Sequence, residues 1–203
     1  MSYDNSKTRP DTSGLTINIS EVLTLIIHEI ISHVPMFSHI DMGRVHVCMS
    51  SNRKSRGGAT FGKLVPLKFK DGREALSYRG RWYAMPEVLH NGMPLLYIIY
   101  FYSPRFLDLS AFEKMRVIFH ELYHISPEFN GDIRRMGKVK SSHGASRKHF
   151  DSHFEDDLVP FYKYICETPF MNFLEMDTQT LFSTFKKVYS NRMKVPRPVV
   201  IKN

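Results

Sequence analysis

Three residues near the middle of the chain, His120, Glu121 and His124, have the types and the spacing of a metal-dependent hydrolytic site. In an α-helix, a spacing of four residues sets two side chains about 40° apart and one turn apart, so both imidazoles can reach one ion. Zinc-dependent peptidases use this His-Glu-x-x-His spacing, in which the glutamate takes a proton from metal-bound water. The spacing therefore predicts that His120 and His124 are metal ligands and that Glu121 is a general base.

A catalytic zinc ion takes three protein ligands and keeps a position for water, so the chain should supply one more donor. The residues that follow the motif offer several candidates: His143, His149, His153, Asp132, Asp151 and Glu155. Spacing alone does not choose among these candidates. Cys48 and Cys166 lie far apart and have no CxxC partner, so we do not assign them as ligands.

The motif lies in a segment, Ser110 to Pro127, whose other residues predict a helix. Ser110 followed by Glu113 is typical of a capping box, in which each side chain bonds to the backbone amide of the other residue. Proline lacks an amide donor, so Pro127 should end the helix near Ile125 or Ser126. Apolar residues recur at three- and four-residue steps and should form a stripe buried against a sheet: Phe112, Met115, Phe119 and Leu122.

Other segments predict the elements around this helix. A first helix should run from Ile19 or Ser20 to Val34, with Ser20 as its N-cap. Alternation and a high content of β-branched and aromatic residues predict four strands: Arg44–Met49, Leu64–Phe69, Tyr78–Tyr83 and Leu95–Ser103. The last of these has the strongest strand signal. It could pair with an extended substrate beside the motif helix, or it could form a central core strand.

The order of these elements defines the expected fold class. We expect an α+β fold in which a small mixed or antiparallel sheet packs against the N-terminal helix and the motif helix, followed by a helical C-terminal part. A turn is expected at Asn91-Gly92, and Asp177 should cap a helix that reaches about Tyr189. Residues 1–14 should be disordered, residues 15–190 should form a single domain, and residues 191–203 should form a basic, extended tail.

The composition limits the class of protein. The chain has 203 residues, of which 42% are hydrophobic, enough for one domain with a sizeable core. It shows no signal peptide and no apolar run of membrane-spanning length, and its two cysteines fit a reducing compartment, so we expect a soluble cytoplasmic protein without a membrane partner. The net charge of +8 could indicate a nucleic-acid partner, but the basic residues are scattered and no recognised reading module accompanies them.

Three runs of residues, HELYHISPEFNGDIRR, HGASRKHFD and FLEMDTQTLFSTFKKVY, resemble the phage-associated metallopeptidases, a zincin-like group. The likeness is densest from Val117 to Asp151 and extends more weakly over most of the chain. The resemblance implies a small α+β metalloprotease with three histidine ligands and a catalytic base: His120, His124, His143 and Glu121. His149 and His153 remain alternatives for the third ligand.

The leading expectation is therefore a zinc metallopeptidase that hydrolyses a peptide or protein substrate, with Glu121 as the base for a metal-activated water. Arg134 could neutralise a substrate carboxylate or the developing oxyanion, whereas Arg135 should form salt bridges. One alternative is a non-catalytic zinc-binding regulatory protein, in which four protein ligands would leave no position for water. Another is a DNA-associated protease similar to the SprT-like group, which would bind DNA through its basic regions.

Overall fold

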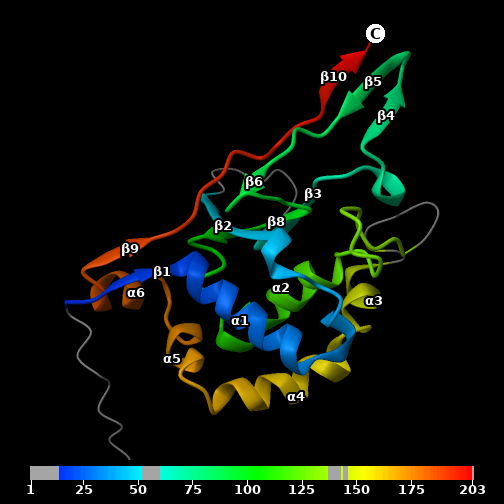
Figure 1. The fold of residues 1–203 in the computed structure, drawn as a ribbon. Helices are drawn as coiled ribbons and strands as arrows, with labels where there is room; N and C mark the ends of the chain where they lie inside the picture. Colours follow the sequence, from blue (N-terminus) through cyan, green and yellow to red (C-terminus); the bar gives the residue numbers. More distant parts are fainter. Residues whose placement is uncertain (1–13, 52–59, 137–142, 144–145, 203) are drawn as a thin grey trace, which may run out of the picture.

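A computed structural model describes residues 14–51, 60–136, 143 and 146–202 of the chain (Figure 1). The described part is a mixed α+β structure with six α-helices and small sheets. Residues 1–13 of the segment predicted to be disordered lie outside the described residues. Within the described ranges, no helix combines the length and the apolar character that crossing a membrane requires.

The central sheet has three strands: β2 (Val45–Ser51), β8 (Tyr97–Ser103) and β3 (Gly62–Pro66). β8 lies in the middle, parallel to β2 and antiparallel to β3. Its residues 97–101 are buried, in keeping with their aromatic and β-branched character. Because β8 is hydrogen-bonded on both sides, it is a core strand with no edge to offer a substrate, and β3 forms one edge of the sheet.

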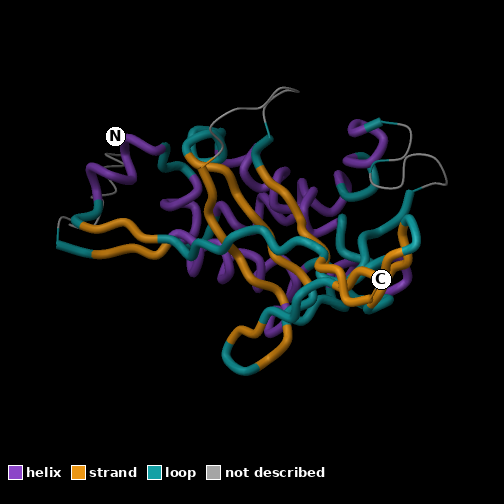
Figure 2. The backbone as a smooth tube through the Cα atoms, turned by 90° about the horizontal axis from the view of Figure 1, so that it is seen from above, coloured by secondary structure: helices purple, strands orange, loops and turns teal. Residues whose placement is uncertain are grey.

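The helices gather on one side of this sheet (Figures 1 and 2). α1 (Ile19–His33) packs against β2 through a buried apolar face. Asn18 caps this helix, and not Ser20 as predicted: the Asn18 side chain accepts a hydrogen bond from the Ser20 amide at 3.1 Å. Ser20 lies inside the helix, where its hydroxyl accepts a hydrogen bond from the Asn191 amide at 3.0 Å. Both residue types cap helices well, so the local sequence does not separate them.

α2 (Ala111–Tyr123) begins where the sequence predicts. The Ser110 hydroxyl accepts a hydrogen bond from the Glu113 amide at 3.3 Å. The second half of the predicted capping box is replaced by an ion pair, since the Glu113 carboxylate contacts Arg116 at 2.8 Å. Regular helix ends at Tyr123, slightly before the predicted end, and His124 is the C-cap with helical backbone angles.

The apolar stripe of α2 packs in part on other helices, within a core that also contains residues of the central sheet. That the whole stripe faces the sheet stays a prediction. Phe112 packs on Tyr162 and Phe119 packs on Phe161, two residues of α4 (Glu155–Cys166), with ring centroids 4.9 and 5.8 Å apart. A different face of α2 meets β3, and this face carries Glu121. The helix lies between the sheet and the C-terminal helices, so it needs two buried faces.

A second sheet, made of β4 (Ala75–Tyr78), β5 (Arg81–Ala84) and β10 (Val199–Lys202), projects from the body of the molecule (Figure 1). The predicted single strand Tyr78–Tyr83 is wrong, because Arg79 and Gly80 form the turn between β4 and β5, with φ of 49° and 76°. Two successive residues with positive φ reverse a chain tightly. The turn predicted at Asn91-Gly92 is confirmed and joins β6 (Leu89–His90) to β7 (Met93–Pro94).

The C-terminal part contains α3 (Arg147–Asp151), α4, α5 (Phe170–Leu174) and α6 (Thr178–Thr184). Asp177 caps α6, as predicted, by accepting a hydrogen bond from the Thr180 amide at 2.7 Å. This helix does not reach Tyr189, because Lys187–Tyr189 form β9, which pairs in parallel with β1 (Thr16–Asn18). Residues 191–203 include β10; the limits of the single domain stay a prediction.

Candidate metal centre

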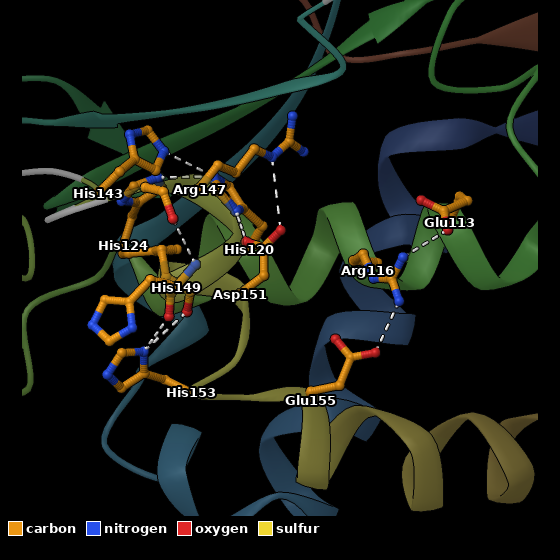
Figure 3. Close-up of polar contacts among 12 residues, drawn as sticks. Glu113, Arg116, His120, His124, His143, Arg147, His149, Asp151, His153 and Glu155 are labelled. Atoms are coloured by element: carbon orange, nitrogen blue, oxygen red, sulfur yellow. Dashed lines mark hydrogen bonds and ion pairs between the residues drawn. The ribbon is translucent and has the colours of Figure 1, made fainter.

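Three imidazoles, those of His120, His124 and His143, converge beside the end of α2 (Figure 3). The Nε2 atom of His120 lies 3.1 Å from Nε2 of His124 and 3.1 Å from Nε2 of His143. One nitrogen from each ring lies within 4.8 Å of the other two. The end of α2 supplies the first two residues at the spacing of one helical turn, and the segment before α3 supplies the third.

A carboxylate fixes the orientation of His120. Asp151, the last residue of α3, accepts a hydrogen bond from Nδ1 of His120 at 2.6 Å. An ionised carboxylate can only accept, so Nδ1 carries the proton and Nε2 keeps its lone pair toward the other imidazoles. Histidines that bind metals commonly have such a partner. The sequence suggested Asp151 only as a possible ligand, and no spacing signal indicates this contact between residues 31 positions apart.

Phe150 forms the apolar base of the site. Its ring centroid lies 4.9 Å from that of His120, 4.5 Å from that of His124 and 5.2 Å from that of His143, and its side chain is fully buried. Burial, with smaller contributions from His120 and His143, lowers the pKa of His124 to about 3. Burial and the neighbouring His120 also lower the pKa of His143. The imidazoles of His124 and His143 are therefore neutral at neutral pH, the form that binds a metal ion.

The donor set fits a divalent transition-metal ion. In a tetrahedral zinc site, with Zn–N distances of about 2.0–2.1 Å, two ligand nitrogens lie about 3.3 Å apart. The two separations of 3.1 Å between Nε2 atoms are close to this value. Imidazole nitrogen suits zinc and related ions better than it suits magnesium or calcium. His120, His124 and His143 together could hold a metal ion.

The other candidate ligands lie elsewhere or have other partners. Nδ1 of His153 contacts the backbone carbonyl of His149 at 2.7 Å, and the His153 ring packs on Tyr123 with centroids 5.7 Å apart. Glu155 forms an ion pair with Arg116 at 2.8 Å. In the part of the chain that the structure describes, none of them joins the group of three histidines.

The two arginines after α2 do not line the candidate site. Arg135 pairs with the buried Asp132 at 2.9 Å, as predicted. Arg134 was the candidate for a substrate carboxylate or an oxyanion, but its Nε donates to the Tyr123 carbonyl at 2.8 Å. Its guanidinium group lies over the Tyr123 ring, 4.2 Å from the centroid. These contacts give Arg134 a structural role at the end of α2.

Glu121 is buried between α2 and β3. Its Oε2 accepts a hydrogen bond from the Leu64 amide at 2.7 Å. Gly62 leaves the space for this approach, because a Cβ at that position would lie only 2.7 Å from Oε1. Burial raises the pKa of Glu121 to about 8, while the Leu64 amide opposes the shift. The structure therefore holds a carboxyl group with a pKa near neutrality beside the edge of the sheet.

A cavity of about 450 Å³ contains both Glu121 and the three imidazoles. The rest of its wall comes from β3 and the two residues before it, from Val117 of α2, from Ile133 and from Arg147 of α3. Glu121 and the histidines can thus act on the same bound molecule. The sequence singled out neither β3 nor Arg147 as part of the site, since both reach it only through tertiary packing.

The fold and the site define a mixed α+β protein with a candidate metal centre of three histidines. A family model with the description "Putative phage metallopeptidase" matches residues 17–168, which include the central sheet, α2 and α3. The chain therefore belongs to this family, whose name indicates a peptidase that uses a metal ion. No curated protein and no solved structure gives a significant match to the chain.

Proposed function

We propose that the protein is a zinc metallopeptidase of zincin-like architecture that hydrolyses bonds in a peptide or protein substrate. The observation that carries this proposal is the meeting of three imidazoles and one buried carboxyl group in a single cavity. Membership of a metallopeptidase family supports it. His120, His124 and His143 would hold the ion, and three imidazole ligands with one open position are typical of catalytic zinc.

Glu121 would act as the general base. When bound, the ion would supply a Lewis acid that acidifies a water molecule and polarises the substrate carbonyl. The Glu121 carboxylate would take the proton of that water and later deliver it to the leaving amine. A pKa raised to about 8 suits this role, because a group that gains and loses a proton works best near the operating pH. The Leu64 amide would keep the carboxyl group oriented.

The edge of β3 is suited to hold the substrate backbone. Phe61 and Leu67 both make backbone hydrogen bonds in the direction of β8. Phe61 bonds to β8 itself, and Leu67 bonds to the residue that directly precedes β8 in the chain. Bonding directions alternate in an antiparallel ladder, so Gly62 and Leu64 turn their backbone groups away from β8, and the Leu64 amide accordingly reaches Glu121. An extended peptide could add to this edge by backbone pairing. We therefore propose β3, and not β8, as the strand that binds substrate.

The variant Glu121→Gln tests the proposal. Glutamine has nearly the same size and can still accept from the Leu64 amide, but it cannot take a proton. We expect wild-type zinc content by metal analysis and a loss of casein hydrolysis by about 100-fold or more. Glu113→Gln is the matched control: it lies on the same helix outside the cavity and should keep activity. Full activity of Glu121→Gln would reject the assigned role.

No specific observation favours the two alternative functions. A regulatory zinc protein with a closed coordination shell would need four protein ligands, whereas three donors converge among the described residues. A DNA-associated protease should bind DNA at low salt, with an affinity that falls steeply as salt is added. Failure to bind DNA at low salt would remove that alternative.

A further inference from the structure

Two basic side chains line the cavity that contains Glu121 and the imidazoles: Arg147 of α3 and Lys63 of β3. Both residues are exposed, so a molecule entering the cavity can reach their charged groups. Among the described residues of the cavity wall, two side chains are cationic and one, that of Glu121, carries a carboxyl group. The wall of the cavity therefore carries an excess of positive charge.

Arg147 lies beside a carboxylate that has a second partner. Its Nε lies 3.7 Å from Oδ2 of Asp151, one turn further along α3, while Oδ1 of Asp151 accepts from His120. The contact is long and is made by Nε, and among the described residues no hydrogen bond or ion pair occupies the two terminal nitrogens of the guanidinium group. Figure 3 shows the Arg147 side chain beside the imidazoles. Asp151 thus contacts both His120 and Arg147, two residues that line the same cavity.

The two cations come from different elements, β3 and α3, and line one cavity together with the imidazoles. Two positive charges around one cavity favour an anionic group on a bound ligand.

A carboxylate is the group of a peptide that matches this pair. A guanidinium group binds a carboxylate through two parallel hydrogen bonds, and a lysine adds a mobile point charge. A peptide carries carboxylates in acidic side chains and at its C-terminus. Arg134, the arginine that the sequence suggested for this contact, is bonded to Tyr123 instead.

We propose that Arg147 and Lys63 form a carboxylate-binding subsite, so that the enzyme selects peptides with a carboxylate close to the bond it cleaves. The inference rests on the proposed peptidase function, because it takes the occupant of the cavity to be a peptide. The carboxylate belongs either to an acidic side chain or to a free C-terminus, and the experiment separates these two sources.

Binding tests the subsite without requiring hydrolysis. Zinc-loaded Glu121→Gln protein is titrated into fluorescein-labelled peptides that share one sequence, and fluorescence anisotropy gives each affinity. In the first set, each peptide carries one glutamate, placed at each position in turn, and has an amidated C-terminus. The second set has glutamine in place of glutamate and an amidated C-terminus, so it carries no carboxylate. The third set has glutamine and a free C-terminus, so its one carboxylate is terminal. We expect roughly tenfold tighter binding for a carboxylate peptide, the value of one charge-assisted contact. A preference within the first set identifies a side chain, and a preference for the third identifies the C-terminus.

Variants of the two cations locate the preference. Arg147→Gln and Lys63→Gln should weaken binding of the carboxylate peptide and leave the neutral peptide unchanged. Lys148→Gln is the matched control, since it removes the same charge from the same helix at an exposed residue outside the described cavity wall. Equal affinity for all peptides, no binding of any of them, or equal losses in Lys148→Gln and Arg147→Gln would overturn the proposal.

The subsite and the peptidase function can fail separately. A carboxylate preference that depends on Arg147, in a wild-type protein that hydrolyses none of the peptides, would retain the subsite and reject the peptidase function. Hydrolysis by the wild type with the same KM for acidic and neutral peptides would retain the function and reject the subsite.

Discussion

Replacing Gly62 by alanine should misplace Glu121. A Cβ at residue 62 would lie 2.7 Å from Oε1 of Glu121 and 2.8 Å from its Cγ, whereas ordinary contacts begin at 3.4 Å. The backbone of Gly62 is not in the left-handed region, so alanine brings no strain in φ. The Glu121 side chain or β3 must therefore retreat by about 0.7 Å, the difference between 3.4 and 2.7 Å.

A retreat of this size would remove the hydrogen bond that orients the carboxyl group. In the wild type, the Leu64 amide nitrogen lies 2.7 Å from Oε2 of Glu121. Lengthening this distance by about 0.7 Å would bring it above the upper limit of about 3.2 Å for an N–H···O hydrogen bond. A hydrogen bond to a charged group contributes about 1.5–3 kcal/mol. If the transition state loses this contribution, kcat/KM should fall roughly 10- to 100-fold. Overpacking should also lower the free energy of unfolding by about 1–3 kcal/mol.

The assay compares kcat/KM for casein, zinc content and thermal unfolding in the wild type, Gly62→Ala and Gly14→Ala. Gly14→Ala is the control, because a Cβ at that position meets nothing within 4 Å. We expect Gly62→Ala to keep its zinc and lose activity at temperatures where it stays folded. Wild-type kcat/KM in Gly62→Ala would refute the reasoning, since it would mean that the close approach of β3 does not position Glu121.

Three further predictions concern Asp151, Lys114 and Cys48. Asp151→Asn should weaken zinc binding by about 10- to 100-fold in competition titrations, because it alters the hydrogen bond that orients His120; unchanged affinity would exclude this role. Burial lowers the pKa of Lys114 from 10.5 to about 8, so the unfolded chain binds more protons between these values. Chemical denaturation should therefore show the free energy of unfolding rising across this pH range, by up to about 3 kcal/mol, relative to Lys114→Met; parallel curves would contradict this. Burial raises the pKa of the Cys48 thiol to about 11, so iodoacetamide should modify Cys166 much faster in the folded protein and both thiols after unfolding; equal rates in the folded protein would be inconsistent.

Features that depend on neighbouring residues could be predicted from the sequence. The start of α2 after Ser110 and the turn at Asn91-Gly92 are set by side chains within three residues, so their local signals are sufficient. The strand predicted over Tyr78–Tyr83 is wrong because its aromatic residues favour a strand by local propensity, whereas Arg79-Gly80 form a turn between two strands. Local reasoning also failed at Lys187–Tyr189, which continue a helical apolar pattern but pair with β1 from the other end of the chain.

Features that depend on tertiary packing could not be predicted in this way. The place of β3 at the edge of the sheet follows from which strands pair, and no single segment carries that information. The spacing of His120 and His124 already brings two imidazoles together, whereas His143 comes close to them only through tertiary packing. For the same reason, a carboxylate that orients a histidine, such as Asp151, cannot be told in sequence from one that binds an ion.

The central claim is that His120, His124 and His143 hold one zinc ion and leave a position for water. Zinc K-edge X-ray absorption of the zinc-loaded protein tests it most directly. We predict three imidazole nitrogens and one oxygen at about 2.0–2.1 Å in the wild type, and one imidazole fewer in His143→Ala. A shell with sulfur, or one that His143→Ala leaves unchanged, would contradict the account.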